Sequence, residues 1–210
     1  MTPSLVAALA LFAFVASITP GPNNMMLLAS GANFGFRRSV PHMLGVSVGF
    51  GPMVVAVGWG LGGLFALAPW LYDVLRWAGA AYMVYLAWRI ATTEGLKAGA
   101  ADGEPMTFLQ AAAFQWVNPK AWAMALGAVT AYAPTAGYVF NVVAVAVIFT
   151  LINGPCVASW AGFGQGLRRF LDRPTALRTF NIAMALLLLA SLIPFFMELG
   201  GKASAIASSR

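Results

Sequence analysis

Two short runs of helix-breaking and polar residues interrupt long apolar stretches of this chain, and they carry its most unusual chemistry. The runs are Thr19-Pro20-Gly21-Pro22-Asn23-Asn24 and Asn118-Pro119-Lys120. A proline inside a helix removes a backbone hydrogen bond and leaves a carbonyl oxygen without its donor. Inside a bilayer such breaks are tolerated only where protein or a water-filled cavity satisfies the freed backbone groups. The pattern therefore indicates a permeation site.

Each run carries the signature of a helix start. Thr19 precedes Pro20, and Asn118 precedes Pro119, in the order of an N-cap residue followed by proline at the first helical position. A helix that starts at membrane depth directs its free N–H groups and the positive end of its dipole toward the membrane centre. We therefore expect two helix N-termini to face one site that can hold a carboxylate.

Lys120 adds a full positive charge to this expected site. It lies about 13 residues into an apolar stretch of about 25 residues, where a lysine costs about 2.5 to 3.5 kcal/mol. This cost favours a functional role, and the alternative is a side chain that extends to the membrane interface. The nearby amides either line the same cavity or hydrogen-bond neighbouring helices, and they are Asn23, Asn24, Gln115 and Asn153. The expected pocket suits a small anionic or zwitterionic solute.

The composition defines the elements that must position these residues. Hydrophobic residues make up 60% of the 210-residue chain and charged residues only 9%, which is typical of an integral membrane protein. Six apolar stretches are long enough to cross a bilayer, at about 20 residues each. They cover residues 5–32, 40–66, 69–91, 107–131, 138–165 and 177–198. We expect an all-α fold of six transmembrane helices, of which the first and fourth are broken.

The two halves of the chain resemble each other as faint repeats. Pro20 and Pro119 lie 99 positions apart, and the Gly-Pro pairs at 51–52 and 154–155 lie 103 positions apart. Because each half has an odd number of spans, the second half enters the membrane from the side opposite to the first. The expected arrangement is therefore an inverted repeat. The sequence predicts one domain over 1–210, with repeats 1–91 and 107–210 joined by a cytoplasmic linker, 92–106.

The positive charges indicate the orientation of the chain. Eight of the twelve basic residues fall in the loops after the first, third and fifth spans, and they are Arg37, Arg38, Arg89, Lys97, Arg168, Arg169, Arg173 and Arg178. The positive-inside rule then places both termini outside the cytoplasm. The net charge of +6 therefore reflects topology rather than nucleic-acid binding. The expected location is a bacterial inner membrane.

Few other residues could carry chemistry. The single cysteine, Cys156, excludes an internal disulfide, and one histidine without a pair of deep acids excludes the usual enzymatic constellations. We expect no enzymatic activity, no metal site and no cofactor. Three groups could carry protons, namely Lys120, His42 and Asp73. His42 could instead be structural, and Asp73 could form a surface ion pair with Arg76, three residues away.

These residues resemble the lysine exporter (LysE/RhtB) family of amino-acid exporters. The similarity includes both runs, and it extends to three further segments, Phe34-Gly35-Phe36-Arg37-Arg38, Pro41-His42 and Phe114-Gln115-Trp116-Val117. It covers nearly the whole chain and is greatest for exporters of neutral amino acids, including cysteine and O-acetylserine. The resemblance implies a proton-coupled secondary exporter of the inner membrane, with residues 19–24 and 118–120 near the substrate.

The charge inventory restricts the solute independently. A dibasic amino acid requires a carboxylate in the pocket, but the spans contain no deep Asp or Glu. A neutral zwitterion fits better, because its carboxylate can meet Lys120 and its ammonium can meet freed carbonyl groups. The alternatives that remain are a channel or an exporter of another small metabolite. The chain could work as a monomer or as a homodimer.

Overall fold

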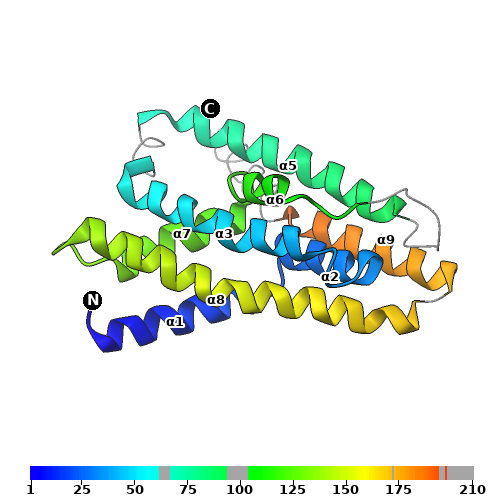
Figure 1. Ribbon diagram of the computed structural model, residues 1–210. Helices are drawn as coiled ribbons and strands as arrows, with labels where there is room; N and C mark the ends of the chain where they lie inside the picture. The colour runs from blue at the N-terminus through cyan, green and yellow to red at the C-terminus, as the bar shows by residue number, and fades with distance from the viewer. Residues whose placement is uncertain (62–66, 94–103, 172, 194–196, 198–210) are drawn as a thin grey trace, which may run out of the picture.

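The computed structural model describes residues 1–61, 67–93, 104–171, 173–193 and 197, and within this part all regular secondary structure is helical. The expected all-α class is therefore confirmed. The helices form an elongated bundle whose long members run along a common axis (Figure 1). Their bounds are α1 Pro3–Ile18, α2 Pro22–Phe34, α3 Val40–Ala56, η1 Val57–Leu61, α5 Pro69–Thr92, α6 Phe108–Gln115, α7 Pro119–Tyr132, α8 Tyr138–Leu167, η2 Arg168–Phe170 and α9 Pro174–Ala190.

Several helices are long and apolar enough to cross a membrane. In the described residues two pass by length and hydropathy, Val40–Gly60 and Tyr138–Phe170, and the bent pair α1 and α2 makes a third if it is counted as one span. The other expected spans are divided between shorter helices or carry more polar residues, as in α6 with α7 and in α5. Parts of the expected spans 40–66 and 177–198, most of the linker and Lys97 lie outside the described residues.

Both expected helix breaks are present. The chain bends by 57° between α1 and α2, and residues 116–118 separate α6 from α7. Asn118 caps α7, and its side chain accepts a hydrogen bond from the Lys120 backbone N–H. The predicted N-cap in the second half is confirmed.

The predicted N-cap at Thr19 is wrong. Thr19 is the C-cap of α1 rather than the N-cap of α2. The α2 helix has Gly21 as its N-cap and Pro22 at its first position. A residue that precedes proline is driven out of the helical region. Because Thr19 and Gly21 both precede a proline, both are extended, at φ −65° and ψ 145° for Thr19 and φ 179° and ψ 177° for Gly21. The helix can therefore begin only at Pro22.

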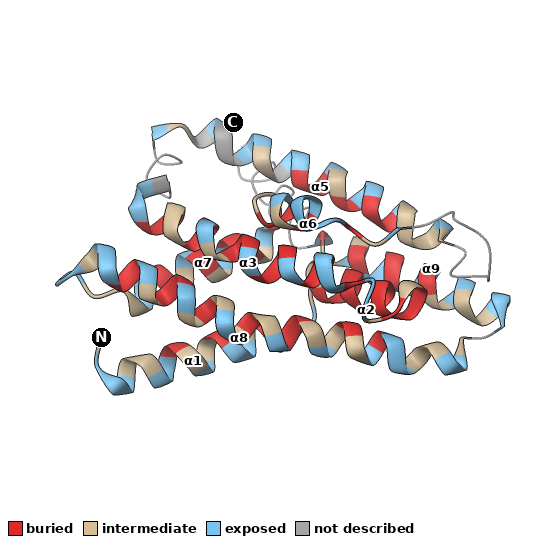
Figure 2. Cartoon of the chain, in the orientation of Figure 1, coloured by how far each residue is buried: buried red, intermediate tan, exposed pale blue. Residues whose placement is uncertain are grey.

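The buried residues lie between the helices and form two main clusters (Figure 2). One cluster joins α2, α3, α5, α6, α8 and α9 and includes Leu27 and Phe114. The other joins α1, α3, α7 and α8 and includes Leu9 and Phe149. The α2 and α8 helices pack closely at Gly31, because a Cβ atom at this position would overlap the backbone carbonyl of Ala161 on α8.

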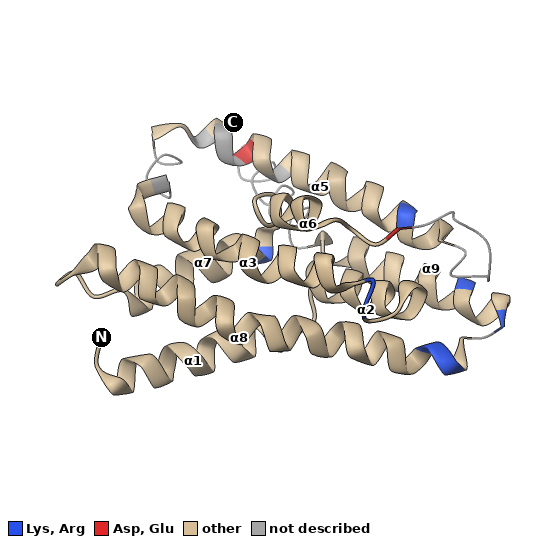
Figure 3. Cartoon of the chain, viewed as in Figure 1, with Lys and Arg blue, Asp and Glu red and all other residues tan. Residues whose placement is uncertain are grey.

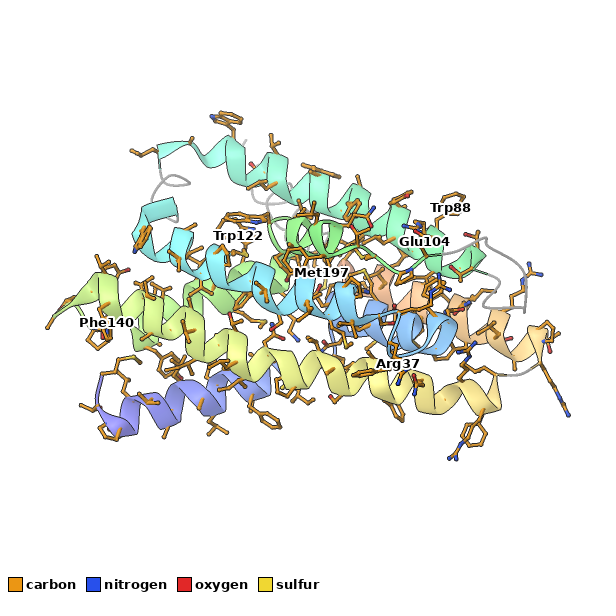
Figure 4. All side chains as sticks on the ribbon, in the orientation of Figure 1. Arg37, Trp88, Glu104, Trp122, Phe140 and Met197 are labelled. Atoms are coloured by element: carbon orange, nitrogen blue, oxygen red, sulfur yellow. The ribbon has the colours of Figure 1, made fainter. Side chains whose placement is uncertain are left out.

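The outer surface is strongly apolar. Large hydrophobic side chains such as Leu11, Leu109, Phe140 and Leu151 are more than half exposed, and Trp88 projects away from the bundle in Figure 4. Soluble monomers rarely expose so many large apolar side chains, whereas a surface that faces lipid requires them. The protein is therefore a multi-pass membrane protein.

The described cations gather at one end of the bundle, which we call the arginine-rich end (Figure 3). Arg37, Arg38 and Arg168 surround one surface hollow there, and Arg89 lines a neighbouring pocket. The N-terminus lies at the opposite end. Lys120 is an exception among the cations, because it lies near the middle of the bundle between the two helix breaks.

Candidate functional site between the helix breaks

The Lys120 side chain crosses from the second helix break to the first. Its Nζ atom donates to the Thr19 carbonyl at 2.8 Å, to the Thr19 hydroxyl oxygen at 3.0 Å and to the Pro20 carbonyl at 3.3 Å. An ammonium has three N–H donors, so these contacts use its full capacity. No acidic group pairs with Lys120 among the described residues. In the described part of the chain, backbone and hydroxyl dipoles balance its charge.

Gly21 provides the space for this crossing. A Cβ atom at position 21 would lie 2.7 Å from Lys120 Cδ and 3.1 Å from its Nζ. Gly21 also offers no side chain to cap α2. The first-turn N–H groups of α2 therefore lack the side-chain acceptor that Asn118 supplies to α7, and such an end attracts a carboxylate.

A reciprocal pair of amides forms a second link between the breaks. Asn23 Nδ2 donates to Gln115 Oε1 at 2.9 Å, and Gln115 Nε2 donates to Asn23 Oδ1 at 3.3 Å. Gln115 Nε2 also donates to the Ala111 carbonyl at 2.8 Å. Gln115 is 1% exposed, so the pair holds the start of α2 against the end of α6 away from bulk water.

The remaining carbonyl groups of the first break are satisfied by two further side chains. Asn24 Nδ2 donates to the Ser17 and Thr19 carbonyls at 2.8 and 2.7 Å. Trp160 Nε1, from α8, donates to the Ile18 carbonyl at 3.1 Å. Each carbonyl from Ser17 to Pro20 therefore has a side-chain donor.

The second break is satisfied from within its own segment. Backbone N–H groups at 116–118 donate to carbonyls at 113–115, and Trp122 Nε1 donates to the Trp116 carbonyl at 2.8 Å. Asn118 caps the following helix.

A small cavity lies where the breaks meet. The volume open to water is about 20 Å³, which is room for about one water molecule and too little for an amino acid. The cavity is therefore too small for a substrate in this structure, while Thr19 and Pro20 beside it are exposed. Phe50 and Val157, one from each main cluster, form part of the wall. The predicted site residues that line it are Gly21, Asn23, Asn24, Gln115, Asn118, Lys120 and Asn153.

The other predicted residues lie next to the cavity or far from it. Thr19 and Pro20 contact Lys120, and Pro22 and Pro119 each begin a helix. His42 lines a different pocket, nearer the arginine-rich end. Asp73 is exposed on α5 and lines neither pocket. The Arg76 side chain, its expected partner, lies outside the described residues.

Two polar residues that line the cavity have no hydrogen-bond partner among the described residues. Asn153 of α8 is 4% exposed and forms no hydrogen bond with any of them. The Ser17 hydroxyl likewise has no partner, but its oxygen is sealed from water in this structure. Buried polar groups are nearly always hydrogen-bonded, so Asn153 is positioned to receive a ligand or water.

Sequence reasoning missed Ser17 and Trp160. Ser17 could have been found, since it is a polar residue in the last turn before the first break. Trp160 has no such signal, because its contact with Ile18 depends on how α8 packs beside α1.

Two interrupted apolar helices that meet at a lysine, inside an apolar helical bundle, define a membrane transport protein. The comparisons with known proteins agree with this class. The family model described as LysE type translocator matches residues 14–196. The chain belongs to this family, and it is a transporter rather than an enzyme. The resemblance expected from the two runs is confirmed.

The chain is also similar to individual curated proteins. It is 32% identical to the cysteine/O-acetylserine efflux protein of Escherichia coli strain K12 over 197 residues, which is 93% of this chain and 100% of that protein. The protein of the same name from Shigella sonnei strain Ss046 matches to the same extent. No solved structure matches the chain.

Proposed function

We propose that this protein is a secondary active exporter of small neutral amino acids or their derivatives. The relatives with 32% identity are named cysteine/O-acetylserine efflux proteins, which supports this substrate class. The observation that carries the proposal is the Lys120 ammonium, held by Thr19 and Pro20 between two helix breaks. This geometry provides separate places for the two charges of a zwitterion.

The substrate carboxylate pairs with Lys120 and with the first-turn N–H groups of α2. Gly21 leaves those groups without a side-chain cap, and a helix N-terminus favours an anion. Once Lys120 turns toward the carboxylate, the Thr19 and Pro20 carbonyls are free for the substrate ammonium. In this structure the lysine ammonium thus takes the place of the substrate ammonium. Asn153 is available for the substrate's polar side chain.

Alternating access is the mechanism that fits this site. We propose six spans in two inverted repeats, in which α1 with α2 corresponds to α6 with α7. The paired breaks support this correspondence, as do Pro52 in α3 and Pro155 in α8, one within each half. Rocking of one repeat against the other would open the site first to one side and then to the other.

We place proton coupling at Lys120. Among the proton-carrying candidates, Lys120 alone touches the proposed substrate site, whereas His42 lies in another pocket and Asp73 is exposed. A lysine that alternates between the substrate carboxylate and a deprotonated state links proton movement to export. Retained pH-driven export by Lys120→Gln would contradict this assignment.

The proposed location is a bacterial inner membrane, with the arginine-rich end toward the cytoplasm and both termini outside it. The position of Arg37, Arg38, Arg89 and Arg168 at one end supports this orientation through the positive-inside rule. The N-terminus lies at the other end of the bundle.

Counterflow in proteoliposomes tests the proposed function. Vesicles that contain the purified protein are loaded with one unlabelled amino acid at a time, and uptake of labelled L-cysteine is followed under reducing conditions. We expect saturable exchange with cysteine, O-acetylserine and other small neutral amino acids, and none with lysine. Lysine as the only exchanged amino acid would overturn the substrate class. Flux without saturation or counterflow would instead indicate a channel.

A further inference from the structure

Three arginines converge on one hollow at the arginine-rich end. Arg37 and Arg38 come from the turn between α2 and α3, and Arg168 directly follows α8, 130 positions after Arg38. The volume of the hollow that is open to water is about 470 Å³, within the range of sites that hold small organic groups. The proposed function gives this hollow no role. Its other lining residues carry no charge, and they are Phe34, Gly35, Phe36 and Gln165.

Packing holds two of the guanidinium groups at the hollow. Arg38 lies over the Phe34 ring, 5.8 Å from the ring centroid, in a cation–π contact. The half-buried Arg168 packs against the turn itself, because a Cβ atom on Gly35 would lie 3.4 Å from Arg168 Nη1. The charges therefore come together from two distant segments. The positive-inside rule accounts for arginines in these loops, but it does not require them to share one hollow.

The donors around the hollow lack an acceptor within the protein. The side chains of Arg37, Arg38 and Arg168 form no ion pair or hydrogen bond with any described residue. Gln165 Oε1 accepts a hydrogen bond from the Phe36 backbone N–H at 2.6 Å, which leaves Gln165 Nε2 as a further donor. Arginine binds phosphate oxygens in pairs. The hollow thus has the charge and the donors for a phosphate group.

An apolar groove lies further along the same two helices. The α3 and α8 helices lie side by side (Figure 1), and the groove between them has a volume of about 630 Å³ and includes Val48, Val147 and Leu151. Positions 147 and 165 are 18 residues apart, which is five helical turns, so both lie on one face of α8.

The groove lies within reach of the hollow. Val48 is eight residues after Val40, the first residue of α3, which is about 12 Å along the helix. Half of the hydrocarbon core of a bilayer is about 15 Å thick. An acyl chain that starts at the hollow can therefore extend into the groove.

We propose that the hollow and the groove together bind one anionic phospholipid of the surrounding membrane. The three guanidinium groups bind its phosphate, and one acyl chain lies between α3 and α8. Charge selects this occupant, because basic pockets between membrane helices bind anionic headgroups. The groove adds apolar contacts that a soluble anion cannot use. Since the turn and the end of α8 belong to different halves of the chain, the lipid joins the halves at this end.

Native mass spectrometry of the full-length protein tests the proposal. The protein in detergent micelles is titrated with dioleoylphosphatidylglycerol, with dioleoylphosphatidylcholine or with inorganic phosphate. Wild type is expected to bind one phosphatidylglycerol at least about tenfold more tightly than phosphatidylcholine, since each arginine near a headgroup contributes about fivefold.

Two pairs of substitutions separate the site from general attraction to charge. Arg38→Gln with Arg168→Gln should weaken phosphatidylglycerol binding about 25-fold and leave phosphatidylcholine binding unchanged. Arg173→Gln with Arg178→Gln is the matched control, because it removes two exposed arginines that do not line the hollow. The control should change binding by less than about twofold. Equal weakening by the two pairs would overturn the site.

Val147→Trp tests the groove by filling it. Phosphatidylglycerol binding should fall at least about fourfold, the effect of one buried CH₂ group. Val139→Trp is the control, because Val139 is an exposed residue of the same helix outside the groove. Inorganic phosphate that binds as tightly as the lipid would overturn the proposal and assign the hollow to a free anion. A lipid-free dimer that Val147→Trp dissociates would likewise overturn it and assign the groove to a second copy of the chain.

Discussion

The two helix breaks of this protein are satisfied differently. The second break, at 116–118, uses partners from its own segment, including the Trp122 indole and the Asn118 cap. The first break has one local donor, Asn24, but the carbonyls of Ile18, Thr19 and Pro20 also receive hydrogen bonds from Lys120 and Trp160, which belong to the second half of the chain. One break is therefore self-contained, and the other is completed by remote groups.

This difference indicates which break can respond to a solute. A backbone hydrogen bond within one segment persists while that segment stays folded. A lysine ammonium that reaches across to carbonyl groups can leave them and pair with an anion or another dipole at little cost to the fold. We therefore propose that the first break provides a site that the substrate can enter, and that the second provides the rigid support that carries Lys120.

Replacing Lys120 by methionine should have the largest effect. It removes the bonds to Thr19 and Pro20 and the proposed carboxylate partner, and bonds to a charged group contribute about 1.5 to 3 kcal/mol each. We expect counterflow to fall about 100-fold or more. Arg178→Gln, which removes an exposed charge, should retain full activity. Near-normal exchange by Lys120→Met would contradict the proposal that Lys120 makes the first break responsive to a solute.

Gly21→Ala should have the next largest effect. The new Cβ would lie 2.7 Å from Lys120 Cδ, so the lysine must leave its position although the fold can tolerate the methyl group. We expect counterflow to decrease about tenfold, or about 1.4 kcal/mol. Gly166→Ala on α8 is the control, because nothing lies within 4 Å of the added atom. Equal activity of the two variants would mean that the Lys120 position is unimportant.

Gln115→Leu tests the amide link between the breaks. It leaves the half-buried Asn23 without its partner, at a cost of about 1 kcal/mol, the low end for an unsatisfied buried group, and exchange should fall about fivefold. Gln110→Leu on the same helix removes only a local capping box with Thr107 and should change exchange less than twofold. An unchanged rate in Gln115→Leu would show that the breaks need no amide bridge.

Two tryptophan variants compare the breaks directly. Trp160→Phe removes a donor to the first break and Trp122→Phe removes a donor to the second, and each conserves an aromatic ring. At about 0.7 kcal/mol for the lost hydrogen bond, within the usual range, exchange should fall about threefold in Trp160→Phe and less in Trp122→Phe. The reverse order of the two rates would contradict the assignment of the responsive break.

Much of this architecture could be predicted from residue patterns. The apolar stretches, the positions of both breaks and the cap at Asn118 follow from local rules about proline, N-caps and hydrocarbon. The error at Thr19 also has a local cause, because two alternating prolines force Thr19 and Gly21 into extended conformations. A single Thr-Pro pair does not impose this constraint.

The partners of the site residues could not be predicted, because they depend on packing between distant helices. The sequence placed Lys120 in the membrane, but Thr19 lies 101 residues away along the chain and meets it only in the fold. Trp160 reaches Ile18 across 142 residues for the same reason. Residue type alone makes both His42 and Lys120 candidate proton carriers. Only the fold shows that they line different pockets.

The most direct test of the account observes the Lys120 ammonium itself. The chain has three lysines, so replacing Lys97 and Lys202 by arginine leaves one Nζ signal in a protein labelled at that atom. NMR spectra of this protein in nanodiscs are recorded while L-cysteine is added under reducing conditions. The account predicts that the Nζ resonance shifts and saturates as Lys120 exchanges Thr19 and Pro20 for the carboxylate. A resonance that stays unchanged while counterflow is active would contradict it.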